Sequence, residues 1–197
     1  MLWDLGLDDI DDEDMVKQKI EEAEDNFDLV MILEKFEESL ILLKNELCWD
    51  FSDITSIKLN GRVEEVKTKL NKTTRNLLKD FLKSDYLLYD HFYQLFKLKR
   101  EIFGKQRLKA ELNILSSING ETFQTCSLAQ SNKLVGSPRQ SWGGKGLQGV
   151  EARNKTNEDC LKMTLRERDF VQRVRNIQTE KIRQKHFPGL VVPTVAR

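Results

Sequence analysis

The sequence has few of the residues that build metal centres. Among its 197 residues are 3 cysteines and 2 histidines. The cysteines form no C-x-x-C pair and have no nearby histidine at the spacing of metal ligands, which argues against a zinc site. We therefore expect no metal. The scarcity of histidine also limits general-base chemistry, since only His91 and His186 offer an imidazole.

Long apolar runs and a net charge are also absent. No window approaches the roughly eighteen apolar residues that indicate a membrane span, and acidic residues follow Met1 where a leader would have a basic region and an apolar stretch. The 32 basic and 32 acidic residues cancel, so no global field indicates nucleic acid or a membrane surface. The charge is uneven, with a net −10 over residues 1–28 and +6 over residues 161–197. Solvated faces and a flexible tail are the favoured interpretation.

One stretch changes its hydrophobic period partway through. Residues 27–33 form a nearly unbroken apolar run, which predicts a short strand buried on both faces. From residue 33 onward the apolar residues recur at steps of three and four, which predicts an amphipathic helix. Its apolar stripe would consist of Leu33, Phe36, Leu40, Leu43 and Leu47.

The rest of the chain reads as mostly helical. An acidic helix is predicted over residues 11–26, and helices throughout residues 63–116, where a wide aromatic face surrounds Phe92. A second short strand is predicted over residues 54–59, ended by Asn60-Gly61. Many glycines and polar residues predict a long loop over residues 116–157, and a last basic helix follows over residues 161–184, ended by Pro188-Gly189. The expected fold is predominantly α-helical with one or two short strands.

Four blocks carry a resemblance to a known family. They are F-D-L-V-M-I-L-E-K-F-E-E-S-L-I-L-L-K-N-E-L-C-W at residues 27–49, M-L-W-D-L-G-L-D-D at 1–9, I-T-S-I-K-L-N-G-R at 54–62, and the helix at 84–96. Along the chain they occur in the order in which similar blocks occur in the galactose 3-O-sulfotransferase family, which they resemble, and the likeness covers roughly residues 1–165. It implies a P-loop-like α/β sulfotransferase fold, of which this chain would be an incomplete, C-terminal portion.

The resemblance also implies a domain organisation and a location. Residues 1–116 would be the C-terminal part of the sulfotransferase domain, residues 117–157 a Gly/Ser-rich loop or linker, and residues 158–197 a basic helix with a divergent tail. Family members are Golgi membrane proteins with a lumenal catalytic domain. We therefore expect the Golgi lumen, no nucleic-acid partner, and a membrane contact only through an anchor that lies outside this sequence.

The activity implied by the resemblance is sulfate transfer from 3′-phosphoadenosine 5′-phosphosulfate (PAPS) to the 3-hydroxyl of galactose in glycolipids or glycans. The family holds this donor with a K-T-x-S-S-T loop and an R-D-P-x-x-x-F-x-S element. Neither occurs in the sequence. We therefore expect an inactive fragment when the chain is alone. The alternative is a non-catalytic helical interaction protein derived from a sulfotransferase.

Several residues are candidates for the acceptor site. Ligands of α/β sheets bind beyond the carboxyl ends of strands, and Glu34, Glu37 and Glu38 follow the predicted strand. These carboxylates and the amide of Asn60 suit the hydroxyls of a galactose. A solvated first turn of a helix explains Glu37 and Glu38 equally well. His91 matches a histidine of the family and is a candidate base, although a histidine on an aromatic helix face is more often structural.

The remaining candidates concern the donor, the cysteines and glycosylation. Trp142 and Lys145, in the glycine-rich segment 141–149, would contact the donor's adenine and phosphate, unless this segment is simply a flexible loop. The resemblance suggests a disulfide between Cys126 and Cys160, with three free thiols as the alternative. Asn71 and Asn154 lie in N-x-T sequons, which are acceptors only in the secretory pathway and also arise by chance.

Overall fold

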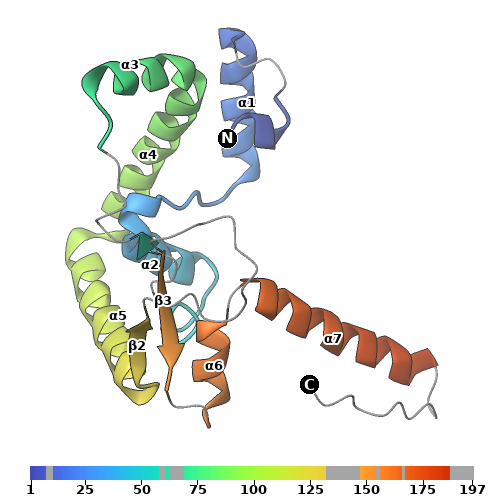
Figure 1. The fold of residues 1–197 in the computed structure, drawn as a ribbon. Helices are drawn as coiled ribbons and strands as arrows, with labels where there is room; N and C mark the ends of the chain where they lie inside the picture. Colours follow the sequence, from blue (N-terminus) through green and yellow to red (C-terminus); the bar gives the residue numbers. More distant parts are fainter. Residues whose placement is uncertain are drawn as a thin grey trace. The chain divides into compact units, whose positions relative to one another are not determined.

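The computed structural model describes residues 1–7, 11–57, 61–62, 69–131, 147–153, 156–165 and 167–186. Over these residues the chain is mostly helical, with three short strands in one sheet (Figure 1). It divides into two compact units, the first comprising residues 1–56 and 62–122 and the second residues 57–61 and 123–197. Each unit is described by itself below.

Helix α1 (Glu13–Asn26) confirms the predicted acidic helix. The Asp12 carboxylate caps its first turn by accepting hydrogen bonds from the backbone N–H groups of Asp14 and Met15, at 3.0 and 3.1 Å. Such a cap satisfies N–H groups that have no partner within the helix. Val16, Ile20 and Ala23 recur along one face and are buried. This face packs against α4 (Lys83–Phe103).

Among the elements that lie wholly within the first unit, helix α4 is the longest, and its buried face forms the centre of the core. Leu88 and Phe92 pack with Val16 and Ile20 of α1 and with residues of the N-terminal 3-10 helix region. Phe96, one turn further on, packs with Ile32 and with a residue of α2. The predicted aromatic face is therefore core. It does not extend to Ile102, which is 77% exposed.

Three further helices complete the first unit. They are α2 (Phe36–Glu46), α3 (Lys72–Phe81) and α5 (Lys105–Thr125), which belongs to this unit up to Thr122. The predicted helical stretch is thus divided at Leu82 and at Gly104, whose φ of 95° favours glycine. A second cluster packs α2 against α5 through Leu40, Ile41, Ile54, Leu108 and Leu115.

The predicted strand over residues 27–33 is wrong. Residues 27–32 form no strand, although the backbone is extended at Phe27 and Ile32. The Ser39 hydroxyl satisfies both backbone groups of Ile32: it accepts from the N–H at 3.0 Å and donates to the C=O at 3.2 Å. A side chain of α2 thus takes the place of a neighbouring strand.

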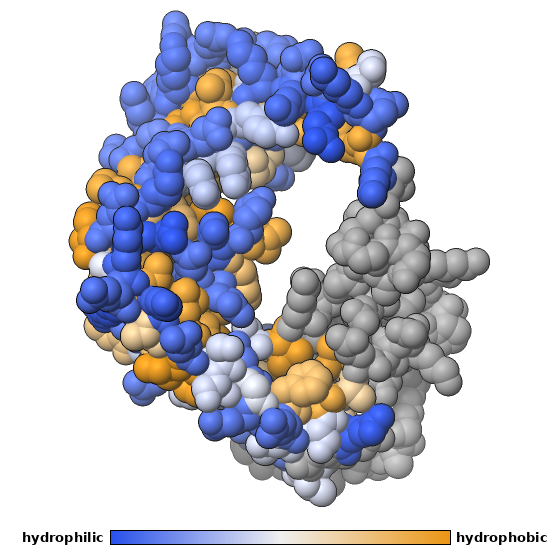
Figure 2. All heavy atoms as spheres, turned by 90° about the vertical axis from the view of Figure 1, so that its left-hand side faces the viewer, coloured by the Kyte–Doolittle hydropathy of each residue, from blue (hydrophilic) through white to orange (hydrophobic). Residues whose placement is uncertain are grey.

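The predicted amphipathic helix is found as α2, but of its predicted apolar stripe only Leu40 is buried. A short 3-10 helix, η2 (Leu33–Lys35), precedes α2, and the buried residues of α2 are Ser39, Leu40, Ile41 and Leu42. Leu33 and Phe36 lie outside this buried set and are 81% and 44% exposed. On the face drawn in Figure 2, hydrophobic residues form separate patches among hydrophilic ones.

The strands lie elsewhere than predicted. Residues 54–57 are not a strand, and residues 58–60 lie outside the described part of the chain. The sheet has the order β1-β3-β2, with β1 (Gly61–Arg62), β2 (Leu128–Ser131) and β3 (Leu147–Ala152). Leu128 pairs with Ala152 and Ser131 with Gly149 in an antiparallel register. The predicted loop over residues 116–157 therefore contains the end of α5 and two strands.

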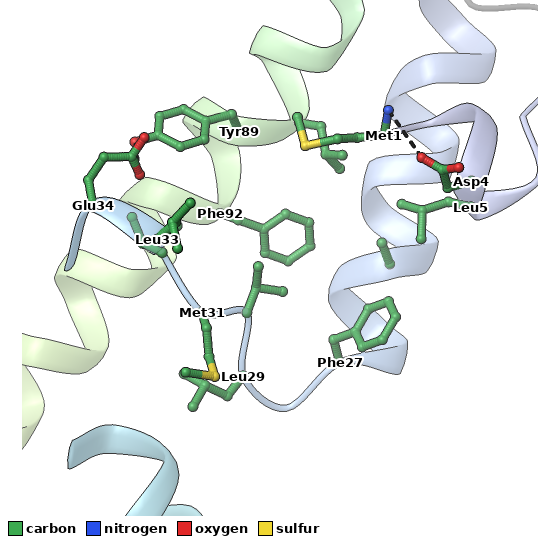
Figure 3. Close-up of a pocket in the computed structure, with 14 residues that line it drawn as sticks. Met1, Asp4, Leu5, Phe27, Leu29, Met31, Leu33, Glu34, Tyr89 and Phe92 are labelled. Carbon is green, nitrogen blue, oxygen red and sulfur yellow. Dashed lines mark hydrogen bonds and ion pairs between the residues drawn. The ribbon is translucent and has the colours of Figure 1, made fainter. Parts of the chain in front are cut away.

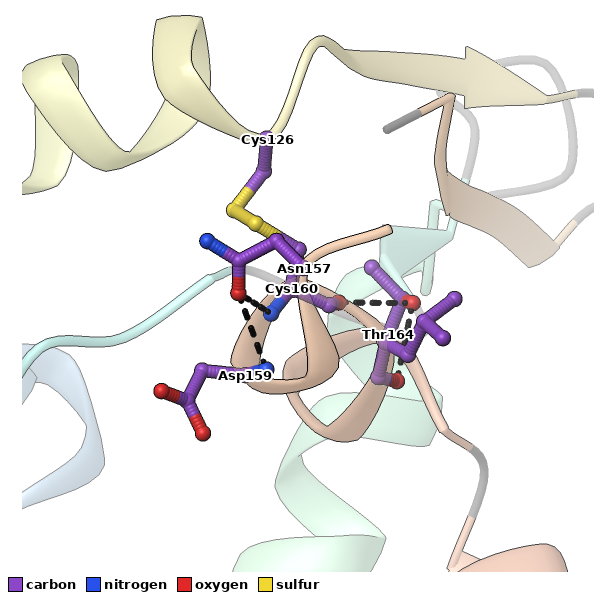
Figure 4. Close-up of a disulfide and its surroundings, with 6 residues drawn as sticks. Cys126, Asn157, Asp159, Cys160 and Thr164 are labelled. Atoms are coloured by element: carbon purple, nitrogen blue, oxygen red, sulfur yellow. Dashed lines mark hydrogen bonds between the residues drawn. A yellow bond between two sulfur atoms is a disulfide. The ribbon is translucent and has the colours of Figure 1, made fainter. Parts of the chain in front are cut away.

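The second unit has a small core closed by a disulfide. Cys126 and Cys160, the pair suggested by the family resemblance, are joined with their Cα atoms 5.3 Å apart. Asn157 caps helix α6 (Glu158–Thr164) beside this bond, as Figure 4 shows. Leu128 and Ala152 are buried and pack with Cys126 and Cys160.

The predicted last helix is in fact two, α6 and α7 (Glu167–His186). The break falls at Leu165, whose ψ of 140° is extended. Pro188 and Gly189 lie outside the described residues. The predicted division of the chain into residues 1–116, 117–157 and 158–197 stays a prediction.

Replacing Ser39 by Ala should lower the free energy of unfolding by about 1–3 kcal/mol, because the buried N–H of Ile32 would lose its partner, while the Ile32 C=O would keep the Lys35 N–H at 2.9 Å. Urea denaturation followed by circular dichroism measures the loss. Ser116→Ala, at an exposed position of α5, is the control and should change the free energy of unfolding by only about 0.5 kcal/mol. Equal stabilities of the two variants would contradict the role of Ser39.

Alkylation of the native, unreduced chain should modify only Cys48, the exposed free cysteine. Replacing both Cys126 and Cys160 by Ser should lower the free energy of unfolding by about 2–4 kcal/mol, because the bond restricts the unfolded chain across a separation of 34 residues. Mass spectrometry counts the adducts, and Cys48→Ser is the stability control. Three adducts on the native chain would rule out the bond.

Candidate functional site

A pocket in the first unit is the candidate functional site. Its volume is 640 Å³, within the usual range for sites that bind small molecules. It lies between the 3-10 helix η1 (Trp3–Leu5), the end of α1, residues 27–34 and α4 (Figure 3). Apolar side chains form most of its wall, and the lining residues from the last two elements include Leu29, Met31, Leu88 and Phe92.

Glu34 and Tyr89 bring polar atoms to the edge of this pocket. Glu34 lies in η2 and Tyr89 in α4, and the Tyr89 hydroxyl donates a hydrogen bond to the Glu34 carboxylate at 3.3 Å. The Tyr89 ring stacks on Tyr93 with 5.8 Å between centroids. Desolvation and the Glu34 carboxylate raise the pKa of Tyr89 above its ordinary 10.0. Tyr89 is therefore a neutral phenol near pH 7, able to donate and accept hydrogen bonds.

The other predicted acceptor residues do not line this pocket. Glu37 is exposed on the first turn of α2. Glu38 forms ion pairs with Arg100 and, at 3.6 Å, with Lys35, and its side chain is only 16% exposed. Of the three predicted glutamates, the structure therefore brings only Glu34 to the pocket. Asn60 lies outside the described residues.

His91 has a partner away from the pocket. Its Nε2 lies 2.6 Å from a carboxylate oxygen of Glu24, so that it connects α4 to α1. The ring also makes an edge contact with Phe92, with 5.3 Å between centroids. This contact fits the structural interpretation of a histidine on an aromatic face. The role of His91 as a base stays a prediction.

The remaining candidates fall on helix ends or outside the described chain. Asn71 is exposed and caps α3, accepting a hydrogen bond from the Thr74 N–H at 2.8 Å. Its glycosylation stays a prediction, as does that of Asn154, which is not among the described residues. Trp142 and Lys145 also lie outside them. Within the described ranges, no group of three or more His, Cys, Asp or Glu residues is arranged to hold a metal ion.

The start of α3 does not fit the phosphates of PAPS. A phosphate-binding loop connects a buried strand to a helix whose first N–H groups are free. The segment Asn71-Lys72-Thr73-Thr74 at the start of α3 is superficially similar, but residues 69–70 before it are not a strand. The Thr74 N–H is already bonded to Asn71. This helix end therefore offers no donor site.

Sequence reasoning missed several residues of the pocket. Tyr89 was identifiable only as part of an aromatic helix face, and its hydrogen bond to Glu34 spans 55 residues of sequence. Met1, Asp4 and Leu5 also line the pocket (Figure 3), although the sequence gives them no role beyond the family resemblance. No periodic signal predicts which long-range contacts enclose a cavity.

Comparison with known proteins identifies the family. The family described as Galactose-3-O-sulfotransferase matches residues 1–178. The chain belongs to this family. Its relatives include galactosylceramide sulfotransferase of Bos taurus, with 31% identity over 156 residues, and that of Mus musculus, with 32% over 162 residues. Galactose-3-O-sulfotransferase 2 of Homo sapiens is 28% identical over 205 residues.

These matches cover much of this chain but a smaller share of the relatives. The two galactosylceramide sulfotransferase matches cover 76% of this chain and 37% of the relative. The galactose-3-O-sulfotransferase 2 match covers 96% of this chain and 51% of the relative. No solved structure matches the chain. Among the described residues, every helix is too short or too polar to cross a membrane.

Replacing Glu34 by Gln should lower the pKa of Tyr89 toward 10.0, because it removes a negative charge that disfavours the tyrosinate. Ultraviolet titration of tyrosinate absorbance, taken as the difference from the unmodified chain, measures the change. Glu37→Gln is the matched control, since Glu37 does not line the pocket. An unchanged titration in Glu34→Gln would show that the two side chains are not in contact.

Proposed function

We propose that this chain is the C-terminal part of a sulfotransferase that transfers sulfate from PAPS to the 3-hydroxyl of galactose in glycolipids or glycans. The observation that carries this proposal is the family match over residues 1–178. In the reaction the galactose oxygen bonds to sulfur, the bond from sulfur to the donor's phosphate oxygen breaks, and 3′-phosphoadenosine 5′-phosphate leaves. A base accepts the hydroxyl proton, and His91 is the proposed candidate.

The acceptor side of the reaction is the part that this chain supports best. A carboxylate such as Glu34 accepts hydrogen bonds from sugar hydroxyls, and the neutral hydroxyl of Tyr89 can donate or accept one. Glu37 is exposed and free to contribute, and Asn60 remains a proposed ligand. Glu38 is the weakest of the proposed set, because Arg100 already neutralises its carboxylate.

The donor side is proposed to lie largely outside residues 1–197. The K-T-x-S-S-T loop that the resemblance leads us to expect does not occur in the sequence, and the start of α3 does not substitute for it. We propose that the P-loop-like part of the fold comes from another portion of the enzyme, that Trp142 and Lys145 contribute at most the closing wall, and that the chain alone transfers no sulfate.

The proposed location is the lumen of the Golgi. An oxidising compartment would allow the bond between Cys126 and Cys160. It would also make the exposed Asn71 an acceptor for glycosylation. A membrane contact would come from an anchor that is not part of these residues.

A chimera tests the proposal. Residues 1–178 would replace the aligned segment of bovine galactosylceramide sulfotransferase, so that the relative supplies the donor loops. We expect sulfated galactosylceramide from the chimera with labelled PAPS, and none from residues 1–197 alone. Glu34→Gln in the chimera should raise the KM for the acceptor several-fold, because the lost charge weakens its hydrogen bonds to the sugar.

The control is the chimera's own folding and donor binding. Calorimetry with 3′-phosphoadenosine 5′-phosphate should show binding to the chimera and none to the isolated chain. A chimera that binds this nucleotide but forms no product would contradict the proposed transfer activity. It would favour a non-catalytic protein derived from a sulfotransferase.

A further inference from the structure

The pocket of the first unit has the apolar wall of a site for an alkyl chain. Its volume is 640 Å³, and side chains from η1, α1, residues 27–34 and α4 surround it. Most of its wall is apolar: Leu5, Leu29 and Phe92 surround it (Figure 3), and Ala23 and Val30 also line it. Moving each methylene group of a ligand from water into such a wall stabilises the complex by about 0.8 kcal/mol.

The charged groups at the edge of the pocket indicate the ligand's head group. The acidic side chains that line it are Asp4 and Glu34, and no Lys or Arg side chain of the described residues does so. The Met1 α-ammonium, which exists only where Met1 is the first residue of the chain, is paired with Asp4 at 3.5 Å and with Asp85 at 3.1 Å. A cationic head group is therefore favoured at the edge, and an anionic one is repelled.

The surrounding chain strengthens this preference. Residues 1–34 contain thirteen acidic residues and two lysines. The described lysines, Lys17 and Lys19, pair with Asp14 and Glu22 within α1, at 3.4 and 2.5 Å. The N-terminal segment that forms part of the pocket therefore has a net negative charge, which attracts cations from solution at low ionic strength.

We infer that this pocket binds a long-chain amine, with the alkyl chain against Phe27, Leu29 and Phe92 and the ammonium group beside Glu34. The inference does not rest on the proposed function, since a chain that transfers no sulfate would still bind such a ligand. The Tyr89 hydroxyl, which holds the Glu34 carboxylate at the edge of the pocket, would orient the carboxylate toward the ammonium.

Two ligands of opposite charge test the inference on the full chain. Calorimetry with decylammonium and with decanoate, both below their critical micelle concentrations, compares a cationic and an anionic head group on alkyl chains of similar length. We expect decylammonium to bind at least tenfold more tightly than decanoate, and added salt to narrow the difference. Equal or tighter binding of decanoate would overturn the inference, as would no binding of decylammonium.

Matched variants locate the site. Phe27→Ser should weaken decylammonium binding by about tenfold, because the ligand loses apolar contact area. Phe36→Ser is its control, since Phe36 is similarly exposed (44% against 50%) but does not line the pocket. Glu34→Gln should weaken binding by about two- to fivefold, and Glu21→Gln, at an exposed position of α1 that does not line the pocket, should not.

Circular dichroism and thermal unfolding establish that each variant is folded. If folded Phe36→Ser loses as much affinity as folded Phe27→Ser, the amine adsorbs to exposed apolar surface and the pocket is not its site. If Glu34→Gln and Glu21→Gln have equal effects, the head group is not held at the edge of the pocket.

Discussion

The first unit depends on one row of buried side chains along α4. Leu88, Phe92 and Phe96 recur every four residues, so they lie on one face of the helix, and each is at most 6% exposed. Leu88 and Phe92 pack with α1, while Phe96 packs with Ile32 and Leu42. Losing a buried phenylalanine side chain costs about 3–5 kcal/mol, so this row determines whether the helices on either side of α4 stay packed.

The same row also forms a wall of the pocket. Leu88 and Phe92 line it while belonging to the core. Residues 27–34 form another wall, and their path is fixed where the Ser39 hydroxyl bonds to the backbone of Ile32. Glu34 follows Ile32 by two residues, so its position at the pocket depends on this buried serine. The site and the core of the first unit are therefore one structure, and its rigidity comes from packing.

The sequence predicts the helices of this protein better than its connections. Helix α1 is predictable because Asp12 caps it and its apolar residues follow the helical period. The strand expected over residues 27–33 is not found because an apolar run does not reveal whether a partner strand exists. Here a hydroxyl from α2 satisfies the backbone. Likewise the two strands at residues 128–131 and 147–152 were not predicted: they are short, and their pairing partner lies across a long intervening segment, where local sequence gives no signal for it.

The candidate site was only partly predictable for a related reason. Glu34 was expected at the end of a strand, and it reaches the pocket although that strand does not exist. Tyr89 bonds to Glu34, and Met1 lines the same pocket, although both lie far from Glu34 in the sequence. The disulfide is different: the pairing of Cys126 with Cys160 could be suggested only from the family resemblance, because the spacing of cysteines does not define their connectivity.

The ion pairs of α2 determine which glutamates remain for binding. Glu38 pairs with Arg100, and both side chains are largely shielded, at 16% and 32% exposed. Drawing the Glu38 carboxylate toward a sugar would leave the Arg100 guanidinium without its partner, and breaking a shielded pair costs more than forming a hydrogen bond to a hydroxyl gains. Glu37 has no such constraint but lies away from the pocket. Of these three glutamates, Glu34 combines a carboxylate at the pocket edge with a hydrogen bond that orients it, so we assign binding chemistry at the pocket to Glu34 and Tyr89.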